Sequence, residues 1–305
     1  MNGVKKIAVL SGGWSDERDV SIRSGQQVSV DLKSMGFDVT VIDVKKDLRE
    51  LTDALYRTNP DYVFNMLHGT GGEDGTIQGI LEIFGVPYSN SNVLSSAVCF
   101  NKEITKIIVE KAGVLTIPGM CITANDINLI NNNSNINFDY PFIIKPANNG
   151  SSVGIHLVYN KNDLQKVQSM PWQYGNRVLI ENYIPGREFT VLVINGNAIG
   201  SVEITYKNIF YDFEAKYSNG GSSHKADYEL PEKAKEELHR MARIAYNACL
   251  CNGIARIDFR YDGSQMYFLE INTQPGMTAT SLVPDILKAN GLSMSDLWRI
   301  IKPTV

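Results

Sequence analysis

Several features are missing from this chain of 305 residues, and each absence excludes a class of protein. There is no surplus of basic side chains: 29 lysines and arginines stand against 33 aspartates and glutamates, for a formal net charge of −4. Proteins that bind nucleic acid usually carry such a surplus, so we expect no nucleic-acid partner. The sequence also has no apolar run long enough to cross a bilayer, so we expect no membrane partner.

The apolar segment near the N-terminus is also too short to be a targeting signal. Two lysines precede residues 7–10 (IAVL), but Ser11, Gly12 and Gly13 end the apolar run immediately. A secretion signal needs an apolar core of about 7–15 residues. We therefore expect a cytoplasmic protein.

Cysteine is scarce, and the chain lacks two familiar motifs. Its four cysteines show no paired framework, which suits a reducing compartment. Only Cys249 and Cys251 are close together, and no second Cys or His cluster completes a zinc site, so we interpret them as small buried side chains. No G-x-x-x-x-G-K-[ST] motif occurs, so the chain is not a P-loop protein.

The first third of the chain alternates strand and helix patterns. Hydrophobic residues make up 43% of the sequence, enough for two or three compact units. The predicted elements are strands at 6–10, 38–42 and 62–67 and helices at 19–35, 48–58 and 77–84. This alternation predicts a parallel sheet whose ligands bind beyond the carboxyl ends of the strands, at the loops 11–16 and 68–74.

The rest of the sequence predicts antiparallel strands. A helix over 91–112, broken near Phe100 and Asn101, comes first. Strands follow at 142–145, 154–158 and 178–182, then a hairpin over 188–204 that turns at Asn195 and Gly196. A helix over 231–251 precedes a second hairpin (254–261 and 265–272), and helices complete the chain.

The second hairpin carries the clearest chemical pattern. Arg256 and Asp258 share one face of the first strand, and Glu270 and Asn272 share a face of the second. Both strands are otherwise apolar, and a lone buried carboxylate there would be costly. Two carboxylates and an amide at one end of a sheet are typical ligands of Mg²⁺.

The segment after this hairpin suits an anion. Gly276 allows backbone N–H groups to approach a ligand oxygen, as an oxyanion site requires. Ser281 precedes a predicted helix whose free N–H groups can hold a carboxylate. An ordinary helix cap at Ser281 is the alternative interpretation.

Lysines and glutamates in the middle of the chain suit a nucleotide. Lys145 ends an apolar strand, and the loop that follows it (148–154, NNGSSVG) is rich in small residues that can surround phosphates. Lys102 is a second candidate, although alone it would be an exposed helix lysine. Glu181 and Glu188 are candidate partners of adenine and ribose, although either alone would be an ordinary surface residue.

This combination resembles the ATP-grasp superfamily. Four further segments are similar to motifs of the D-alanine–D-alanine ligase family within it. They are residues 12–21 (GGWSDERDVS), 68–75 (HGTGGEDG), 210–217 (FYDFEAKY) and 269–284. The resemblance extends over nearly the whole chain.

The resemblance implies a role for each matching residue. The implied ligands of the ATP phosphates are Lys102, Lys145, Ser151, Ser152 and Lys216, and those of the nucleoside are Glu181, Ile184 and Glu188. The implied ligands of two Mg²⁺ ions are Asp258, Glu270 and Asn272. Those of the first D-alanine are Glu17 and His68, and those of the second are Ser281 and Leu282. The implied oxyanion donors are Arg256 and the Gly276 N–H, and the residues that would connect a lid to Glu17 are Ser151 and Tyr217.

The resemblance also implies a fold, an activity and partners. The α/β fold would have an N-terminal parallel βαβ domain (1–100) and a two-lobed ATP-grasp domain (101–183 and 184–305), with a lid at 206–224. The activity would be ATP-dependent ligation of two D-alanines through an acyl phosphate, for peptidoglycan synthesis. The implied partners are ATP, D-alanine, Mg²⁺ or Mn²⁺, and a second copy of the chain in a homodimer; activation by K⁺ stays open.

Three alternative functions stay open beside this prediction, and one residue differs from the family's usual sequence. The alternatives are a D-alanine–D-lactate ligase, another ATP-grasp carboxylate–amine ligase, and a nucleotide-binding regulatory protein without turnover. Tyr217 favours a dipeptide over an ester product, and the intact metal residues argue against the regulatory protein. The departure is Asn149, which stands in the phosphate loop where the family commonly has glutamate.

Overall fold

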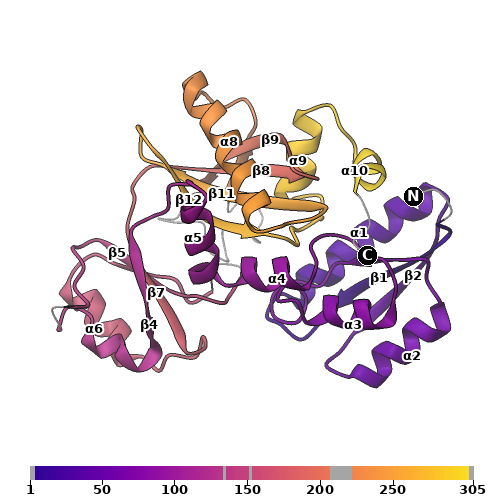
Figure 1. Cartoon of the computed structure of the whole chain (residues 1–305), viewed down its shortest axis with the longest axis horizontal. Coiled ribbons are helices and arrows are strands. Elements are labelled where there is room, and N and C mark those ends of the chain that lie inside the picture. The colour runs from indigo at the N-terminus through magenta and orange to yellow at the C-terminus, as the bar shows by residue number, and fades with distance from the viewer. Residues whose placement is uncertain (1–3, 133–134, 151–152, 207–221, 302–305) are drawn as a thin grey trace.

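Three sheets with helices packed on them form the protein (Figure 1). The computed structural model describes residues 4–132, 135–150, 153–206 and 222–301. Figure 1 shows the N-terminal α/β unit at one end, a small sheet at the other, and the C-terminal sheet between and above them. Among the helices in these ranges, none has the length and apolar composition needed to cross a bilayer.

The N-terminal sheet is parallel, as predicted. Its strands lie in the order β2-β1-β3. They are β1 (Lys6–Gly12), β2 (Asp38–Val44) and β3 (Tyr62–Asn65), and the helices are α1 (Arg18–Ser34), α2 (Leu48–Thr58) and α3 (Thr76–Phe84). Side chains of β1 alternate between two cores: Ile7 and Val9 pack with α1, whereas Ala8 and Leu10 pack with α2 and α3. The strand is therefore buried on both faces, which explains its unbroken apolar run.

A four-stranded antiparallel sheet forms the central part, in the order β4-β7-β5-β6. Its elements are β4 (Gly119–Thr123), the 3₁₀ helix η1 (Ala124–Leu129), β5 (Phe142–Pro146), β6 (His156–Val158), α6 (Lys161–Ser169) and β7 (Arg177–Asn182). η1 and α6 pack on one face of the sheet. β4 and α6 were not predicted, because β4 is short and half-exposed and α6 buries only Leu164 and Val167.

The C-terminal sheet is antiparallel, in the order β10-β9-β8-β11-β12. Its strands are β8 (Arg187–Ile194), β9 (Asn197–Tyr206), β10 (Ser222–Lys225), β11 (Ile254–Tyr261) and β12 (Met266–Asn272). Helix α8 (Glu232–Ala248) covers one face, and α9 (Leu282–Ala289) covers the other. Both predicted hairpins are confirmed.

Two helices connect the N-terminal unit to the other sheets. They are α4 (Val93–Phe100) and α5 (Lys102–Lys111), and Figure 1 shows them running beneath the C-terminal sheet. Asn101 separates them with an extended backbone (φ −96°, ψ 101°), and its side chain accepts a hydrogen bond from the Ile104 N–H at 3.1 Å. The predicted break is therefore an N-cap, which makes Lys102 the first residue of α5.

An aromatic contact joins the two ends of the chain. Trp298 of α10 (Met294–Ile300) meets Phe64 of β3 edge to face, with ring centroids 5.2 Å apart. Both side chains are fully buried, in a core shared by the N-terminal sheet, α9 and α10. Because the carboxyl end of β3 leads to the predicted site loop, this core holds the loop against the C-terminal sheet.

We expect Trp298→Ala to lower the free energy of unfolding by about 3–5 kcal/mol, because it leaves a cavity in this shared core. Urea denaturation followed by circular dichroism measures the change. Ile83→Ala is the matched control, since Ile83 is 92% exposed and should change stability by only about 0.5 kcal/mol. A loss below about 1 kcal/mol in Trp298→Ala would show that the core tolerates the cavity.

Candidate active site

Two pockets adjoin where the three sheets meet. The first lies between the N-terminal loops and the C-terminal sheet, and the second lies between the central and C-terminal sheets. They contain about 970 and 870 Å³ of empty space, part of it open to solvent. Both are lined by Lys102, Asn149, Gly150 and Glu270, so a ligand in one would meet a ligand in the other there.

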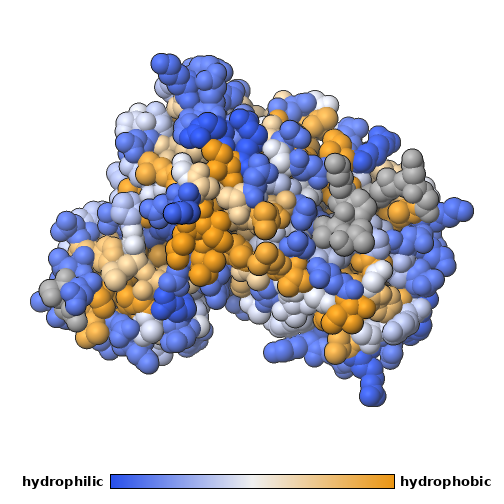
Figure 2. Space-filling view, viewed as in Figure 1, coloured by the Kyte–Doolittle hydropathy of each residue, from blue (hydrophilic) through white to orange (hydrophobic). Residues whose placement is uncertain are grey.

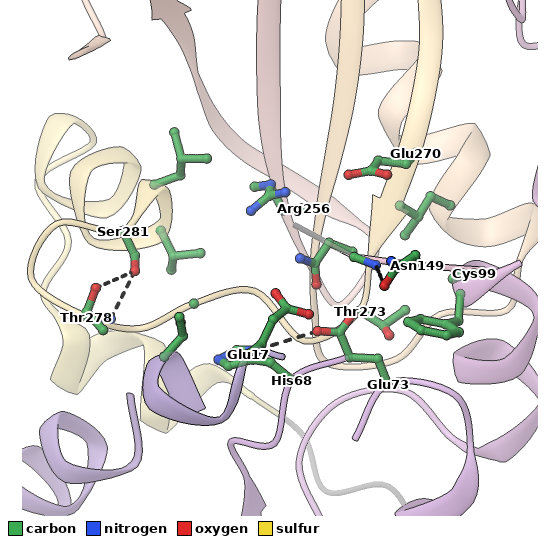
Figure 3. A pocket seen from close by; sticks show the side chains of 18 of the residues that line it. Glu17, His68, Glu73, Cys99, Asn149, Arg256, Glu270, Thr273, Thr278 and Ser281 are labelled. Atoms are coloured by element: carbon green, nitrogen blue, oxygen red, sulfur yellow. Dashed lines mark hydrogen bonds and ion pairs between the residues drawn. The ribbon is translucent and has the colours of Figure 1, made fainter. Parts of the chain in front are cut away.

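Glu17 and His68 form the N-terminal wall of the first pocket (Figure 3). Glu17 immediately precedes α1 and is 8% exposed. The Ser15 hydroxyl donates to the His68 carbonyl at 2.6 Å and so ties the two predicted loops together. Gly150 approaches closely: a Cβ added there would lie 2.7 Å from Glu17 Oε2. A larger residue at position 150 would therefore collide with Glu17.

The charge of this wall depends on the neighbours of the His68 imidazole and on its pKa. Its Nδ1 lies 3.5 Å from Glu73 Oε1, and its Nε2 lies 3.3 Å from the Ser24 hydroxyl. Burial by itself lowers the pKa of His68, but the hydrogen bond and charge of Glu73, together with the charge of Glu17, raise it above the usual value. Glu73 and Glu17 therefore favour the protonated form of His68 more than water does, which is suited to an anionic group.

Arg256 and Glu270 form the opposite wall (Figure 3). Arg256 donates two hydrogen bonds to Asp258, from Nε to Oδ1 at 3.0 Å and from an Nη to Oδ2 at 2.9 Å. The Thr190 hydroxyl donates to the same Oδ1 at 2.5 Å. This bidentate arrangement holds both groups in place on β11.

The register of the hairpin places the two carboxylates opposite each other. Asp258 of β11 pairs with Glu270 of β12, and Arg256 pairs with Asn272. Lys102 Nζ lies 3.1 Å from Glu270 Oε2 and donates to the Asn149 carbonyl at 2.6 Å. The structure thus places Lys102 at the junction of the pockets rather than on an exposed helix face.

The loop after β12 is anchored before it reaches Ser281. The Asn272 side chain accepts from the Gln274 N–H at 2.8 Å. The Gln274 side chain donates to the Asn65 carbonyl and accepts from Asn90 at 2.7 Å, so it ties the loop to the N-terminal unit. Ser281 accepts from the Thr278 N–H at 3.1 Å and precedes α9, as predicted.

The second pocket contains the predicted nucleotide residues. Lys145, Ile184 and Glu188 line it, together with Asp258 and Arg260. Glu188 Oε2 accepts from Arg260 at 3.1 Å and from the Tyr206 hydroxyl at 3.0 Å.

Glu181 lies deeper and is 2% exposed. It pairs with Lys145 at 2.5 Å and also with Lys106. Burial by itself raises the pKa of Glu181, but the two lysines outweigh it and lower that pKa.

Four predicted site residues lie outside the described residues: Ser151, Ser152, Lys216 and Tyr217. Most of the predicted lid (206–224) does as well. Of the lid, the structure describes its two ends, where Tyr206 of β9 pairs with Ser222 of β10.

Two family profiles match the chain. The profile described as "D-ala D-ala ligase C-terminus" matches residues 108–302, and "D-ala D-ala ligase N-terminus" matches residues 48–91. A D-alanine–D-alanine ligase from Paramagnetospirillum magneticum is 42% identical over 302 residues, which cover 97% of this chain and 96% of the relative. The chain belongs to the D-alanine–D-alanine ligase family.

Solved structures of ligases have the same fold. The D-alanine–D-alanine ligase from Bacillus anthracis complexed with ATP matches with a TM-score of 0.82 at 31% identity, covering 98% of this chain and 96% of that one. The VanG D-Ala:D-Ser ligase from Enterococcus faecalis matches with a TM-score of 0.82 at 28% identity, covering 97% and 98%. The predicted ATP-grasp fold class is therefore confirmed.

Several residues of this ligase site were not predicted as ligands or partners: Glu73, Lys106, Arg260 and Gln274. Lys106 had a usable signal, because it lies four residues after Lys102 and so falls on the same face of α5. Arg260 also had one, since it shares a strand face with Arg256 and Asp258. The partners of Glu73 and Gln274 come from other segments, and no local pattern identifies them.

We expect Glu73→Gln to lower the pKa of His68, because the charge that offsets burial is lost while a hydrogen-bond acceptor remains. In the wild type the raised pKa stabilises the folded state fully below the unfolded histidine pKa of about 6.5, and this stabilisation is lost as pH rises through the folded pKa. The stability difference between wild type and variant should therefore shrink above neutral pH. Histidine NMR titration and thermal unfolding from about pH 5.5 to 9 measure both effects.

His156 is an internal control in the same spectra, because burial lowers its pKa and it lies in the central sheet. An unchanged His68 pKa in the variant would contradict the role of Glu73.

Proposed function

We propose that this chain is an ATP-dependent D-alanine–D-alanine ligase that joins two D-alanines through an acyl phosphate and supplies peptidoglycan synthesis. The observation that carries the proposal is the junction of the two pockets at Lys102, Gly150 and Glu270. An amino acid in the first pocket would meet the terminal phosphate of a nucleotide in the second. The names of the Paramagnetospirillum relative and of the Bacillus structure with ATP support these two ligands.

The nucleotide is held by residues of the second pocket. Lys102 and Lys145 bind its phosphates, while Ile184 and Glu188 bind the nucleoside. Glu181 lies behind Lys145, and its contribution passes through that lysine. We also include Ser151, Ser152 and Lys216 as phosphate ligands, on the basis of the sequence alone.

The donor set supports Mg²⁺, or Mn²⁺, as the ion of the site. Asp258, Glu270 and Asn272 offer hard oxygen ligands at one end of the β11–β12 pair. Within the described ranges no three His, Cys, Asp or Glu side chains gather to hold a metal, so the amide and the nucleotide phosphates would complete the coordination. When bound, the ions neutralise charge on the transferring phosphoryl group.

The remaining residues bind and orient the two amino acids. Glu17 binds the ammonium group of the first D-alanine, and His68 lies near its carboxylate. Transfer of the terminal phosphoryl group to that carboxylate gives an acyl phosphate. The N-terminus of α9, at Ser281 and Leu282, holds the carboxylate of the second D-alanine.

The amine of the second D-alanine then attacks the acyl carbon, and phosphate leaves. Arg256 and the Gly276 N–H stabilise the oxyanion of the tetrahedral intermediate. An acyl phosphate hydrolyses readily, so the site must exclude water. The predicted lid, with Tyr217 connected through Ser151 to Glu17, has that role.

The proposed activity also indicates where in the cell the enzyme works and how its chain divides into domains. Its amino-acid substrates and ATP are cytoplasmic metabolites, and we place the protein in the cytoplasm. We divide the chain into an N-terminal substrate domain (1–100) and two ATP-grasp lobes (101–183 and 184–305). The second lobe includes the lid.

Ligation of D-alanine to another partner is the second candidate, because a D-Ala:D-Ser ligase has the same fold. We expect phosphate release from ATP only when D-alanine is present, with D-alanyl-D-alanine as the main product in competition with D-serine and D-lactate. Phosphate release with product analysis by mass spectrometry measures this. A mixed product would support the second candidate, and ATP binding without turnover would support a regulatory protein.

In the same assay, Glu270→Gln should retain less than about a tenth of the wild-type rate, which corresponds to roughly 1.4 kcal/mol of barrier. The substitution removes the charge that faces Asp258 and Lys102 while keeping the size of the side chain. Glu236→Gln, on an exposed position of α8, is the matched control. Near wild-type turnover in Glu270→Gln would remove it from the metal site.

We also propose that the protein forms a homodimer. Figure 2 shows a hydrophobic patch over α4 and α5. Its exposed members include Leu94, Ile104 and Ile107, which are 57%, 40% and 58% accessible. A contiguous apolar face of this kind is suited to association with a second copy.

We expect Ile107→Glu to convert the dimer to a monomer, because it places a charge in the apolar contact. Analytical ultracentrifugation over a range of concentrations measures the mass. Ile83→Glu is the matched control, since Ile83 is exposed on α3. A wild-type monomer, or an Ile107→Glu dimer, would rule out this surface.

A further inference from the structure

Gln274 is a buried amide in the loop between β12 and α9. Its side chain is 1% exposed and is not among the residues that line the two pockets. Its neighbour Thr273 (Figure 3) and the oxyanion donor Gly276 do line the first pocket. Gln274 can therefore influence a ligand only through the segments that it connects.

Three other segments meet at Gln274. Its backbone N–H donates to the Asn272 side chain at 2.8 Å, at the end of β12. Its side-chain oxygen accepts from Asn90 at 2.7 Å, just before α4, and its side-chain nitrogen donates to the Asn65 carbonyl, at the end of β3. The two side-chain hydrogen bonds therefore join this loop to the N-terminal unit across 184 and 209 residues of chain.

The side chain of Asn65 in turn holds the loop that carries His68. It accepts from the Leu67 N–H at 3.0 Å and donates to the Gly72 carbonyl at 3.0 Å. Asn65 is 1% exposed, and hydrogen bonds in such a buried network fix the groups that they join. Gln274 therefore connects the oxyanion loop to the facing wall of the first pocket.

Gly276 lies between this connection and a weaker one. The Met277 N–H donates to the Ser24 hydroxyl at 3.4 Å, which is long for a hydrogen bond. On the other side, Pro275 fixes its own φ at about −65° and restricts the residue before it to extended backbone. Few rotations therefore separate Gln274 from the Gly276 N–H, and the direction of that N–H depends mainly on where Gln274 is held.

We propose that Gln274 is a positioning residue that directs the Gly276 N–H at the oxyanion by holding its loop against the N-terminal unit. This inference rests on the proposed function and assigns the residue to one of its two chemical steps. Phosphoryl transfer to the first D-alanine leaves the acyl carbon trigonal, and the oxyanion forms only when the amine of the second D-alanine attacks. Gln274 thus serves dipeptide formation rather than acyl phosphate formation.

Gln274→Leu tests the inference without changing the pocket lining. Leucine fills a similar space and makes neither side-chain hydrogen bond, while the backbone N–H to Asn272 is kept. Gln78→Leu is the matched control, because Gln78 is 3% exposed and donates to the Gly72 carbonyl at 2.8 Å. Both variants leave buried polar groups without a partner and should lower the melting temperature, but only Gln274 is close to the oxyanion donor.

The experiment compares two rates in the full-length chain with MgATP and D-alanine. Reversal of phosphoryl transfer returns the bridging oxygen of ATP to a different position, so positional isotope exchange in labelled ATP measures formation of the acyl phosphate. Mass spectrometry measures the dipeptide. We expect Gln274→Leu to slow dipeptide formation by about tenfold, since a displaced donor loses part of the about 100-fold that removal of a donor costs. Exchange per dipeptide should rise by about the same factor, and Gln78→Leu should leave this ratio at the wild-type value.

An unchanged ratio in Gln274→Leu would overturn the inference, whether both rates fall together or neither changes. A raised ratio in Gln78→Leu would count equally against it, because loss of any buried glutamine would then have the same effect. If Gln274→Leu does not fold, Asn90→Gly decides: it removes the donor to Gln274, and the φ of 71° at this position suits glycine. That variant should also raise the ratio, and the wild-type ratio there would exclude the role of Gln274. A wild type that makes no dipeptide would instead contradict the proposed function.

Discussion

Pairing of buried charge is the constraint on which this active site depends. Ionised groups cannot leave water without partners, and here nearly every charged group between the sheets has one. Arg256 holds Asp258, Lys102 meets Glu270, and Glu181 is shared by two lysines. These pairs hold the charged groups in place, so the site is organised for charged ligands. Because Lys102 and Lys106 belong to α5, their pairs with Glu270 and Glu181 also hold this helix against the C-terminal and central sheets.

The active site also depends on two glycines that allow the backbone to lie close to neighbouring side chains. Gly150 leaves room for Glu17, and Gly276 leaves room for Ser281, whose hydroxyl would lie 2.9 Å from an added Cβ. Both glycines line the first pocket. A side chain at position 150 would displace the Glu17 carboxylate, and one at position 276 would displace the Ser281 hydroxyl. The large cores on both faces of the C-terminal sheet then hold these approaches at constant distance.

Much of the fold was predictable because local signals agreed with one another. The unbroken apolar run of β1, the 3.6-residue period of α8 and the Asn195-Gly196 turn all predicted elements that the structure has. Elements with few buried residues, such as β4 and α6, gave no such signal. In the site, strand alternation was enough to place Asp258 on the same strand face as Arg256, whereas the structure supplied the register that puts Asp258 opposite Glu270. The ion pair between Arg256 and Asp258 was not predicted, because alternation indicates a shared face but not a contact.

The sequence by itself determined most of the secondary structure, the family and the candidate ligands, because these depend on patterns within short segments. Only the tertiary structure decided which charges pair, since the partners are far apart along the chain. Lys106 meets Glu181 across 75 residues, and Gln274 meets Asn65 across 209. The same reason explains why Lys102 taken alone could be an exposed helix lysine, whereas the fold places it beside Glu270. Proximity in space, set by packing of three sheets, determines the electrostatics of this site.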